Sequence, residues 1–327
     1  MFAACGIHND VLALFYVGQS AGVKMVDFAY FCKSDTDNVS LHGRNYTVWS
    51  FLPLGILRGH LEQSRDRLRE LAEVALRQGH ERERSRALRS LGIALHQLGD
   101  LTGSIRAAQE ARSAAQAVAE WPTWVESTLQ LAAALAELEH YDEARQVADE
   151  ALAARDRLPH PTAIAGLLNL RAEIERRQGR HDAAVPLYEE AAALLDRMGS
   201  LEASIPRLHL ATIHAMEGRF GEAWRLAERC RRESALQGRP PLEMSVRAVL
   251  LLAAIGLSDH AAAEAQVVRL AELHTQRVTS EADTYSMLGL AAKMLADRGE
   301  AETAEILGLI IDRWVSERGT EAERAAR

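Results

Sequence analysis

The chain has 327 residues, and no Pro/Gly/Ser-rich linker or shift in composition divides it, which favours one elongated array over two globular domains. Hydrophobic residues make up 48% of the chain and charged residues 26%, which excludes wholesale disorder. The 46 acidic and 38 basic residues give a net charge of −8, which disfavours direct binding to the phosphate backbone of a nucleic acid.

Residues 1–44 differ in composition from the rest of the chain. Nine of the aromatic residues (five Trp, six Tyr and six Phe in all) lie before residue 54. We predict two short helices, near residues 10–17 and 23–32, that cap the apolar end of the array, and a partner-binding aromatic patch is the alternative. Because polar residues interrupt the apolar stretches and no basic region precedes a cleavage site, we predict neither a signal peptide nor a membrane span.

Four stretches of sequence align without a gap and define an internal repeat: 88–111, 128–151, 168–191 and 207–230. A small residue lies in the middle of the first helix of each stretch, where a neighbouring helix must approach closely. These residues are Gly92, Ala132, Ala172 and Ala211, which gives a period near 40 residues. A turn follows seven residues later, and it begins with Gly99, Glu139, Gly179 and Gly218 in the four stretches.

The same frame extends outward in both directions. Residues 288–311 fit it well, with Gly299 at the turn, and residues 246–273 fit more loosely. Upstream, residues 48–71 fit with Gly59 at the turn, although Pro53 must kink or delay the first helix. The chain therefore contains roughly seven units.

This repeat resembles the tetratricopeptide repeat (TPR) superfamily, whose standard unit has about 34 residues. The longer period resembles the helical arrays of bacterial STAND-type ATPase regulators and of their kinase- or cyclase-linked relatives. The resemblance covers residues 45–313 and implies an all-α fold, a right-handed α-solenoid of antiparallel helix pairs. We expect a helical cap at 1–44, the repeat array at 45–316 and a polar tail at 317–327. Residues 18–25 lack the P-loop spacing, so no nucleotide-binding module is predicted.

Residues with catalytic or metal-binding chemistry do not form a recognisable motif. The 12 histidines include no HExxH pattern, and the spacing of Cys5, Cys32 and Cys230 fits neither a zinc site nor a disulfide framework. We therefore predict no catalytic residue, no metal and no cofactor, in a reduced, cytoplasmic protein. Only three of the 38 basic residues are lysine, a bias that we attribute to a GC-rich, bacterial genome.

In a TPR array, the first helix of each repeat lines the concave face and selects the ligand. The polar side chains expected there, and our candidate partner-binding residues, are Arg86, Arg89, His96, Asn169, Arg176 and Arg177. They suit an extended or helical peptide whose carboxylate lies near Arg89 or Arg176. The alternative is that these arginines are solubilising charges paired with nearby glutamates.

We accordingly expect a scaffold or adaptor that holds a partner protein or peptide carrying an acidic or carboxylate group, in bacterial signalling or regulation. A second reading is a sensor of peptides or small molecules, of the helical-repeat quorum-sensing type. A third is an enzyme that uses a helical cavity, for which no group of residues was found. We expect no direct contact with nucleic acid or membrane, and the sequence does not indicate an oligomeric state.

Overall fold

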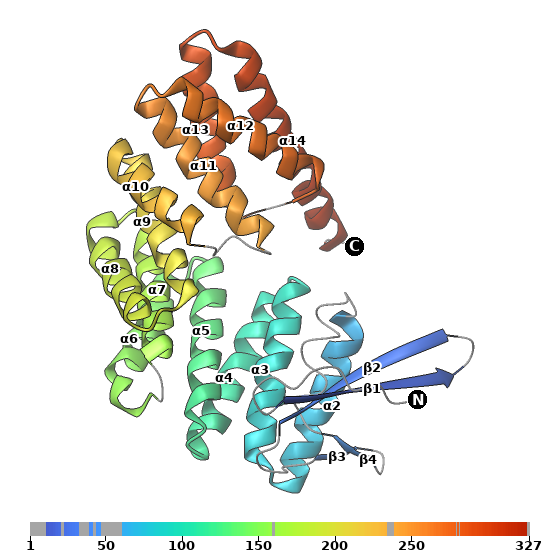
Figure 1. Cartoon of the computed structure of the whole chain (residues 1–327). Helices are drawn as coiled ribbons and strands as arrows, with labels where there is room; N and C mark the ends of the chain where they lie inside the picture. Colours follow the sequence, from blue (N-terminus) through green and yellow to red (C-terminus); the bar gives the residue numbers. More distant parts are fainter. Residues whose placement is uncertain are drawn as a thin grey trace. The chain divides into compact units, whose positions relative to one another are not determined.

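The computed structural model describes residues 11–20, 23–32, 39–41, 44–46, 61–158, 161–233, 239–278, 280 and 282–325 (Figure 1). The chain divides into two compact units, Met1–Ala163 and Ile164–Arg327. The described residues form thirteen α-helices, α2 to α14, and four strands near the N-terminus.

Strands occupy the region where the sequence pattern predicts two capping helices. β1 (Val11–Ser20) pairs antiparallel with β2 (Val23–Cys32), and β3 (Val39–Leu41) pairs antiparallel with β4 (Arg44–Tyr46). The helix prediction is therefore wrong. β-Branched and aromatic residues are frequent in both long strands, and only two residues, Ala21 and Gly22, separate them, which are the features of a β-hairpin.

The first unit continues with α2 and two helix pairs. We call the first helix of each pair the A helix and the second the B helix. The bounds are α2 (Leu61–Gln78), the pair α3 (Glu81–Gln97) and α4 (Leu101–Ala117), the pair α5 (Trp121–Glu137) and α6 (Tyr141–Ala153), and the short 3-10 helix η2 (Arg155–Arg157). α2 corresponds to the B helix of the repeat predicted at 48–71, and the first helix of that repeat lies outside the described residues.

The second unit contains four helix pairs, and its first helix begins just before the unit boundary. The bounds are α7 (Pro161–Arg177) and α8 (His181–Arg197), η3 (Leu201–Ala203), α9 (Ser204–Met216) and α10 (Phe220–Arg232), α11 (Pro240–Gly256) and α12 (His260–Thr275), and α13 (Ala282–Asp297) and α14 (Ala301–Ala325). α14 runs through most of the predicted polar tail, so that residues 317–325 are the end of a helix.

The turns inside the helix pairs lie where the repeat pattern predicts them. The second residue after the end of each A helix has a positive φ, between 59° and 85°: Gly99, Glu139, Gly179, Gly218, Ser258 and Gly299. The amide of the next residue then reaches back to a carbonyl in the last helical turn, as from Asp100 N to Leu95 O (2.9 Å). These bonds satisfy carbonyls that would otherwise lack a partner at the end of the helix.

Small residues allow the helices to pack closely, as the repeat pattern predicts. Ala132, Ala172 and Ala211 are fully buried in the middle of their A helices. A β-carbon on Gly92 would lie 2.3 Å from the side chain of Gln130 on the next A helix, which shows how closely α3 and α5 approach. The helix-pair architecture predicted from the sequence is therefore confirmed in the repeat array.

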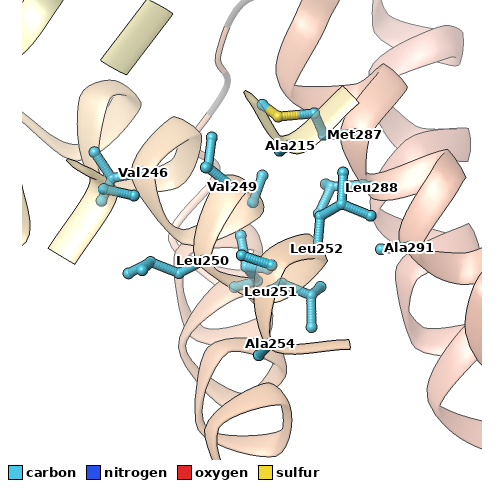
Figure 2. Close-up of a cluster of buried hydrophobic side chains, with 14 of the residues drawn as sticks. Ala215, Val246, Val249, Leu250, Leu251, Leu252, Ala254, Met287, Leu288 and Ala291 are labelled. Carbon is cyan, nitrogen blue, oxygen red and sulfur yellow. The ribbon is translucent and has the colours of Figure 1, made fainter. Parts of the chain in front are cut away.

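The core of the second unit is built around α11. This helix contacts α9, α10, α12 and α13, and its residues from Ala248 to Ile255 are all buried, so this half of the helix is apolar on every side. Leu252 of α11 and Leu288 of α13 belong to this core and lie side by side in Figure 2. Among the described residues, no helix is both long and apolar enough to cross a membrane.

Candidate functional site

In the first unit, three candidate residues lie along the A helix α3, and each pairs with a glutamate at the following A helix. Arg86 Nη2 lies 2.6 Å from Glu120 Oε1 and Arg89 Nη1 lies 2.8 Å from Glu126 Oε2. His96 Nε2 lies 3.0 Å from Glu137 Oε1. We call these three pairs the α3–α5 ladder.

The members of the ladder differ in how accessible they are. The Glu120 side chain is 13% exposed, whereas that of Glu126 is 53% exposed. The hydrogen bond from His96 to Glu137, opposed by partial burial, raises the pKa of His96. The ladder supports the reading that these side chains are paired with nearby glutamates, and Glu126 is the most exposed of the three glutamates.

In the second unit, the other three candidates lie on one stripe of α7 together with Glu173. Arg176 donates to both carboxylate oxygens of Glu173, from Nε at 2.8 Å and from Nη2 at 2.7 Å. Arg177 Nε donates to the same carboxylate at 2.7 Å. Asn169 lies one turn earlier, and its Oδ1 is buried without a hydrogen-bond partner among the described residues.

Side chains from three other helices complete the arrangement around Glu173. The Tyr188 hydroxyl on α8 donates to Glu173 Oε2 at 2.8 Å, and the Tyr188 ring stacks on His209 of α9 with ring centroids 5.1 Å apart. Arg176 Nη2 also lies 2.5 Å from Asp283 Oδ2 at the start of α13. We call Glu173, Arg176, Tyr188, His209 and Asp283 the Glu173 cluster.

The charges of the Glu173 cluster are fixed by their contacts. Burial alone would raise the pKa of Glu173, but the hydrogen bonds and charge of Arg176 outweigh burial and lower it to about 2. Burial and the neighbouring Glu173 charge raise the pKa of Tyr188. Glu173 therefore stays ionised and Tyr188 stays neutral near pH 7, so neither is poised to exchange a proton.

Sequence reasoning missed Tyr188, His209 and Asp283 as members of a site. One signal was available for Tyr188. In the other three stretches that align without a gap, its position is held by an alanine of the B helix, and these alanines are fully buried: Ala108, Ala148 and Ala227. A tyrosine among buried alanines indicates that the neighbouring helix accommodates a polar group at this repeat. No comparable signal marks Asp283, because its contact joins helices that are far apart in the sequence.

The described residues contain no group of three or more His, Cys, Asp or Glu side chains arranged to hold a metal ion. Cys230 is buried against the carbonyl of Ser204, and burial raises its pKa to about 11. A thiol with a raised pKa is mostly protonated and therefore a weak nucleophile near pH 7. Cys230 is thus a packing residue at the position of the repeat where alanine otherwise stands.

No protein-family model matches the sequence, and no curated protein matches it. Solved structures of helical-repeat proteins are similar over most of the chain. A Rap protein complexed with competence and sporulation factor is 16% identical, with a TM-score of 0.60 over 82% of this chain and 73% of that chain. Aspartyl phosphate phosphatase F from Bacillus subtilis is 14% identical, with a TM-score of 0.61 over 82% of this chain and 70% of that chain.

A STAND protein with a tetratricopeptide repeat sensor from Pyrococcus horikoshii is also similar. It is 14% identical, with a TM-score of 0.62 over 84% of this chain and 43% of that chain. The chain therefore has a TPR-like fold of consecutive helix pairs, as its repeat pattern predicts. At these identities, the similarity establishes the fold alone.

Proposed function

We propose that the chain binds a protein or peptide through the polar side chains of its A helices and acts as a scaffold or adaptor in bacterial regulation. The observation that carries this proposal is the α7 stripe of the second unit. There, the Asn169 amide lies on the same side of the helix as Glu173, and its Oδ1 has no partner among the described residues. A side-chain amide offers one acceptor and two donors, the same groups that a peptide backbone presents.

The Glu173 cluster holds the surface beside Asn169 in one conformation. The Arg176 side chain is only 9% exposed and is paired with Glu173 and Asp283. Fixed side chains lose little conformational entropy when a partner binds, so a rigid cluster next to a free amide favours recognition. Because Arg176 is already paired twice, we assign it a positioning role rather than direct contact with a partner carboxylate.

Arg89 of the α3–α5 ladder is the better contact for a partner carboxylate. Its ion partner Glu126 is more than half exposed. Exposed ion pairs contribute about 0.2–1 kcal/mol, so a carboxylate brought by a partner can replace Glu126 at little cost. Arg86 is less available, because Glu120 is mostly buried and Arg86 donates to it from both Nε and Nη2.

The similar structures support a binding role, since one was solved in complex with competence and sporulation factor and another carries a TPR sensor. The proposal is tested by affinity purification from the host, with native mass spectrometry of the recovered chain. We expect a stoichiometric protein or peptide that is lost in the R86E/R89E variant. The matched control is R67E/R106E, which reverses two exposed arginines on the B-type helices α2 and α4.

Circular dichroism must show that both variants remain helical. Recovery of the same partner by R86E/R89E and loss of it in R67E/R106E would refute binding through the A helices of the first unit. If the purified chain retained a small molecule and no protein or peptide, its proposed function would be that of a small-molecule sensor instead of a scaffold.

A further inference from the structure

A cavity of about 370 Å³ lies in the first unit, away from the ladder, between the B helices α4 and α6. Residues at the start of α5 and Arg157 of η2 also line it. Ligand pockets in proteins have volumes of about 300–1,000 Å³, so this cavity suits one small group, the size of an amino-acid residue.

Two tryptophans give the cavity an aromatic lining. The Trp121 and Trp124 rings meet edge to face, with centroids 5.9 Å apart and an interplanar angle of 79°. Each ring carries a guanidinium: Arg112 Cζ lies 5.1 Å from the Trp124 centroid, and Arg157 Cζ lies 5.7 Å from the Trp121 centroid. Aromatic faces with adjacent cations favour an aromatic ligand that carries negative charge.

One cation at the cavity has no ion partner among the described residues. Arg112 Nη2 lies 2.8 Å from Glu150 Oε2, and this hydrogen bond lowers the pKa of Glu150, so these two side chains neutralise each other. Arg157 is exposed and has no ion pair among the described residues. A single spare positive charge matches a carboxylate, whereas Glu150 would repel a doubly charged phosphate.

Two buried donors at the cavity also lack an acceptor. Trp124 is 4% exposed, and neither its Nε1 nor the Nε of Arg112 has a hydrogen-bond partner among the described residues. A buried N–H without an acceptor costs about 1–3 kcal/mol. A ligand oxygen that enters between these rings and guanidinium groups would supply an acceptor that the described side chains do not.

We propose that this cavity binds a carboxylate attached to an aromatic group, with Arg157 holding the carboxylate and Trp121 and Trp124 holding the ring. Two sources present this chemistry. One is the C-terminal residue of a peptide with an aromatic side chain, and the other is a free aromatic acid. The cavity is lined by the B helices α4 and α6, by η2, and by Trp121, Trp124 and Leu131 of the A helix α5. No member of the α3–α5 ladder or of the α7 stripe lines it, so the site is distinct from the surfaces that carry the proposed function.

The test is isothermal titration of the purified full-length chain with N-acetyl-phenylalanine, and with its C-terminal amide as the matched probe without charge. We expect the amide to bind at least about tenfold more weakly, because it loses the charge-assisted contact with Arg157. R157Q should weaken binding of the acid by a similar factor, and W121A should also weaken it. The control R155Q changes an exposed arginine of the same short helix that does not line the cavity and should retain wild-type affinity.

A nitrogen-edited NMR spectrum adds a direct readout, since an acceptor at Trp124 Nε1 should shift its indole N–H resonance. Tighter binding of N-acetyl-Ala-Ala-Phe than of N-acetyl-phenylalanine would identify the C-terminus of a peptide as the source of the ligand. Equal affinity for the two compounds would identify a free aromatic acid as the source. The proposal is overturned if neither acid binds at millimolar concentration, if the amide binds as well as the acid, or if R157Q and R155Q bind alike.

Discussion

The Tyr188 hydroxyl donates a hydrogen bond to the Glu173 carboxylate across 2.8 Å and so joins the B helix α8 to the A helix α7. Tyr188 is fully buried, and Glu173 is the centre of the contacts made by Arg176 and Arg177. A hydroxyl at a position that alanine holds in other repeats thus ties the charged stripe of α7 to the interior of the second unit.

The Y188F variant keeps the ring but removes this bond. We expect a loss of about 1–2 kcal/mol in the free energy of unfolding, because hydrogen bonds to charged groups are stronger than those between neutral groups. Urea denaturation measures the loss, and a double-mutant cycle with E173Q isolates the interaction. If the two single losses simply add in the double variant, the hydroxyl and the carboxylate are not coupled.

The lowered pKa of Glu173 predicts a specific acid sensitivity. Its carboxyl has an ordinary pKa of 4.5 and a folded-state pKa of about 2, so its contribution to stability is complete above pH 4.5 and is lost as the pH falls toward 2. The wild type should therefore lose about 2–3 kcal/mol relative to E173Q over this interval, as measured by urea denaturation at several pH values.

Other ionised carboxylates, such as Glu228, also lose their contacts in acid, so only the difference between the two proteins is informative. The control E62Q replaces an exposed glutamate of α2 and should keep the wild-type acid profile. Parallel acid profiles for wild type and E173Q would show that the carboxylate is not held by Arg176 in solution.

Two glycines of the second unit should respond in opposite directions to alanine. A β-carbon on Gly256, at the end of α11, would lie 2.1 Å from the ring of Phe220, so G256A should cost about 1–3 kcal/mol. No atom lies within 4 Å of a β-carbon on the exposed Gly221 of α10, so G221A should gain about 0.5 kcal/mol from better helix propensity. Thermal or urea denaturation measures the change in the free energy of unfolding for each variant. Equal changes in the two variants would contradict the packing of α10 against α11.

The repeat array was predictable because its determinants recur. Turn residues such as Gly99 and Gly179 and buried alanines such as Ala132 and Ala172 repeat at a constant spacing, and each contact joins neighbouring helices. In a solenoid, each repeat packs mainly on the next, so a pattern within one repeat indicates the contacts of all. This is why the turns and close crossings agree with the sequence pattern.

The N-terminal strands and the Glu173 cluster were not predictable for different reasons. Short apolar and aromatic runs such as 11–20 and 23–32 are compatible with either a helix or a strand. Their antiparallel pairing with each other, which the sequence pattern does not indicate, makes them a hairpin. The contact between Arg176 and Asp283 joins α7 to α13, and no spacing within one repeat indicates it. The partners of Arg86 and Arg89 likewise depend on which glutamates the next A helix presents.

The most direct test of the account is the affinity of the recovered partner for R89E and for E126Q. If the partner places a carboxylate on Arg89, R89E should weaken binding at least about tenfold, because the contact becomes repulsive. E126Q should leave the affinity unchanged or increase it, because it releases Arg89 from its internal ion pair. R106E, on the B helix α4, should bind as the wild type does. Unchanged binding by R89E, together with weaker binding by R106E, would contradict recognition through the A helices.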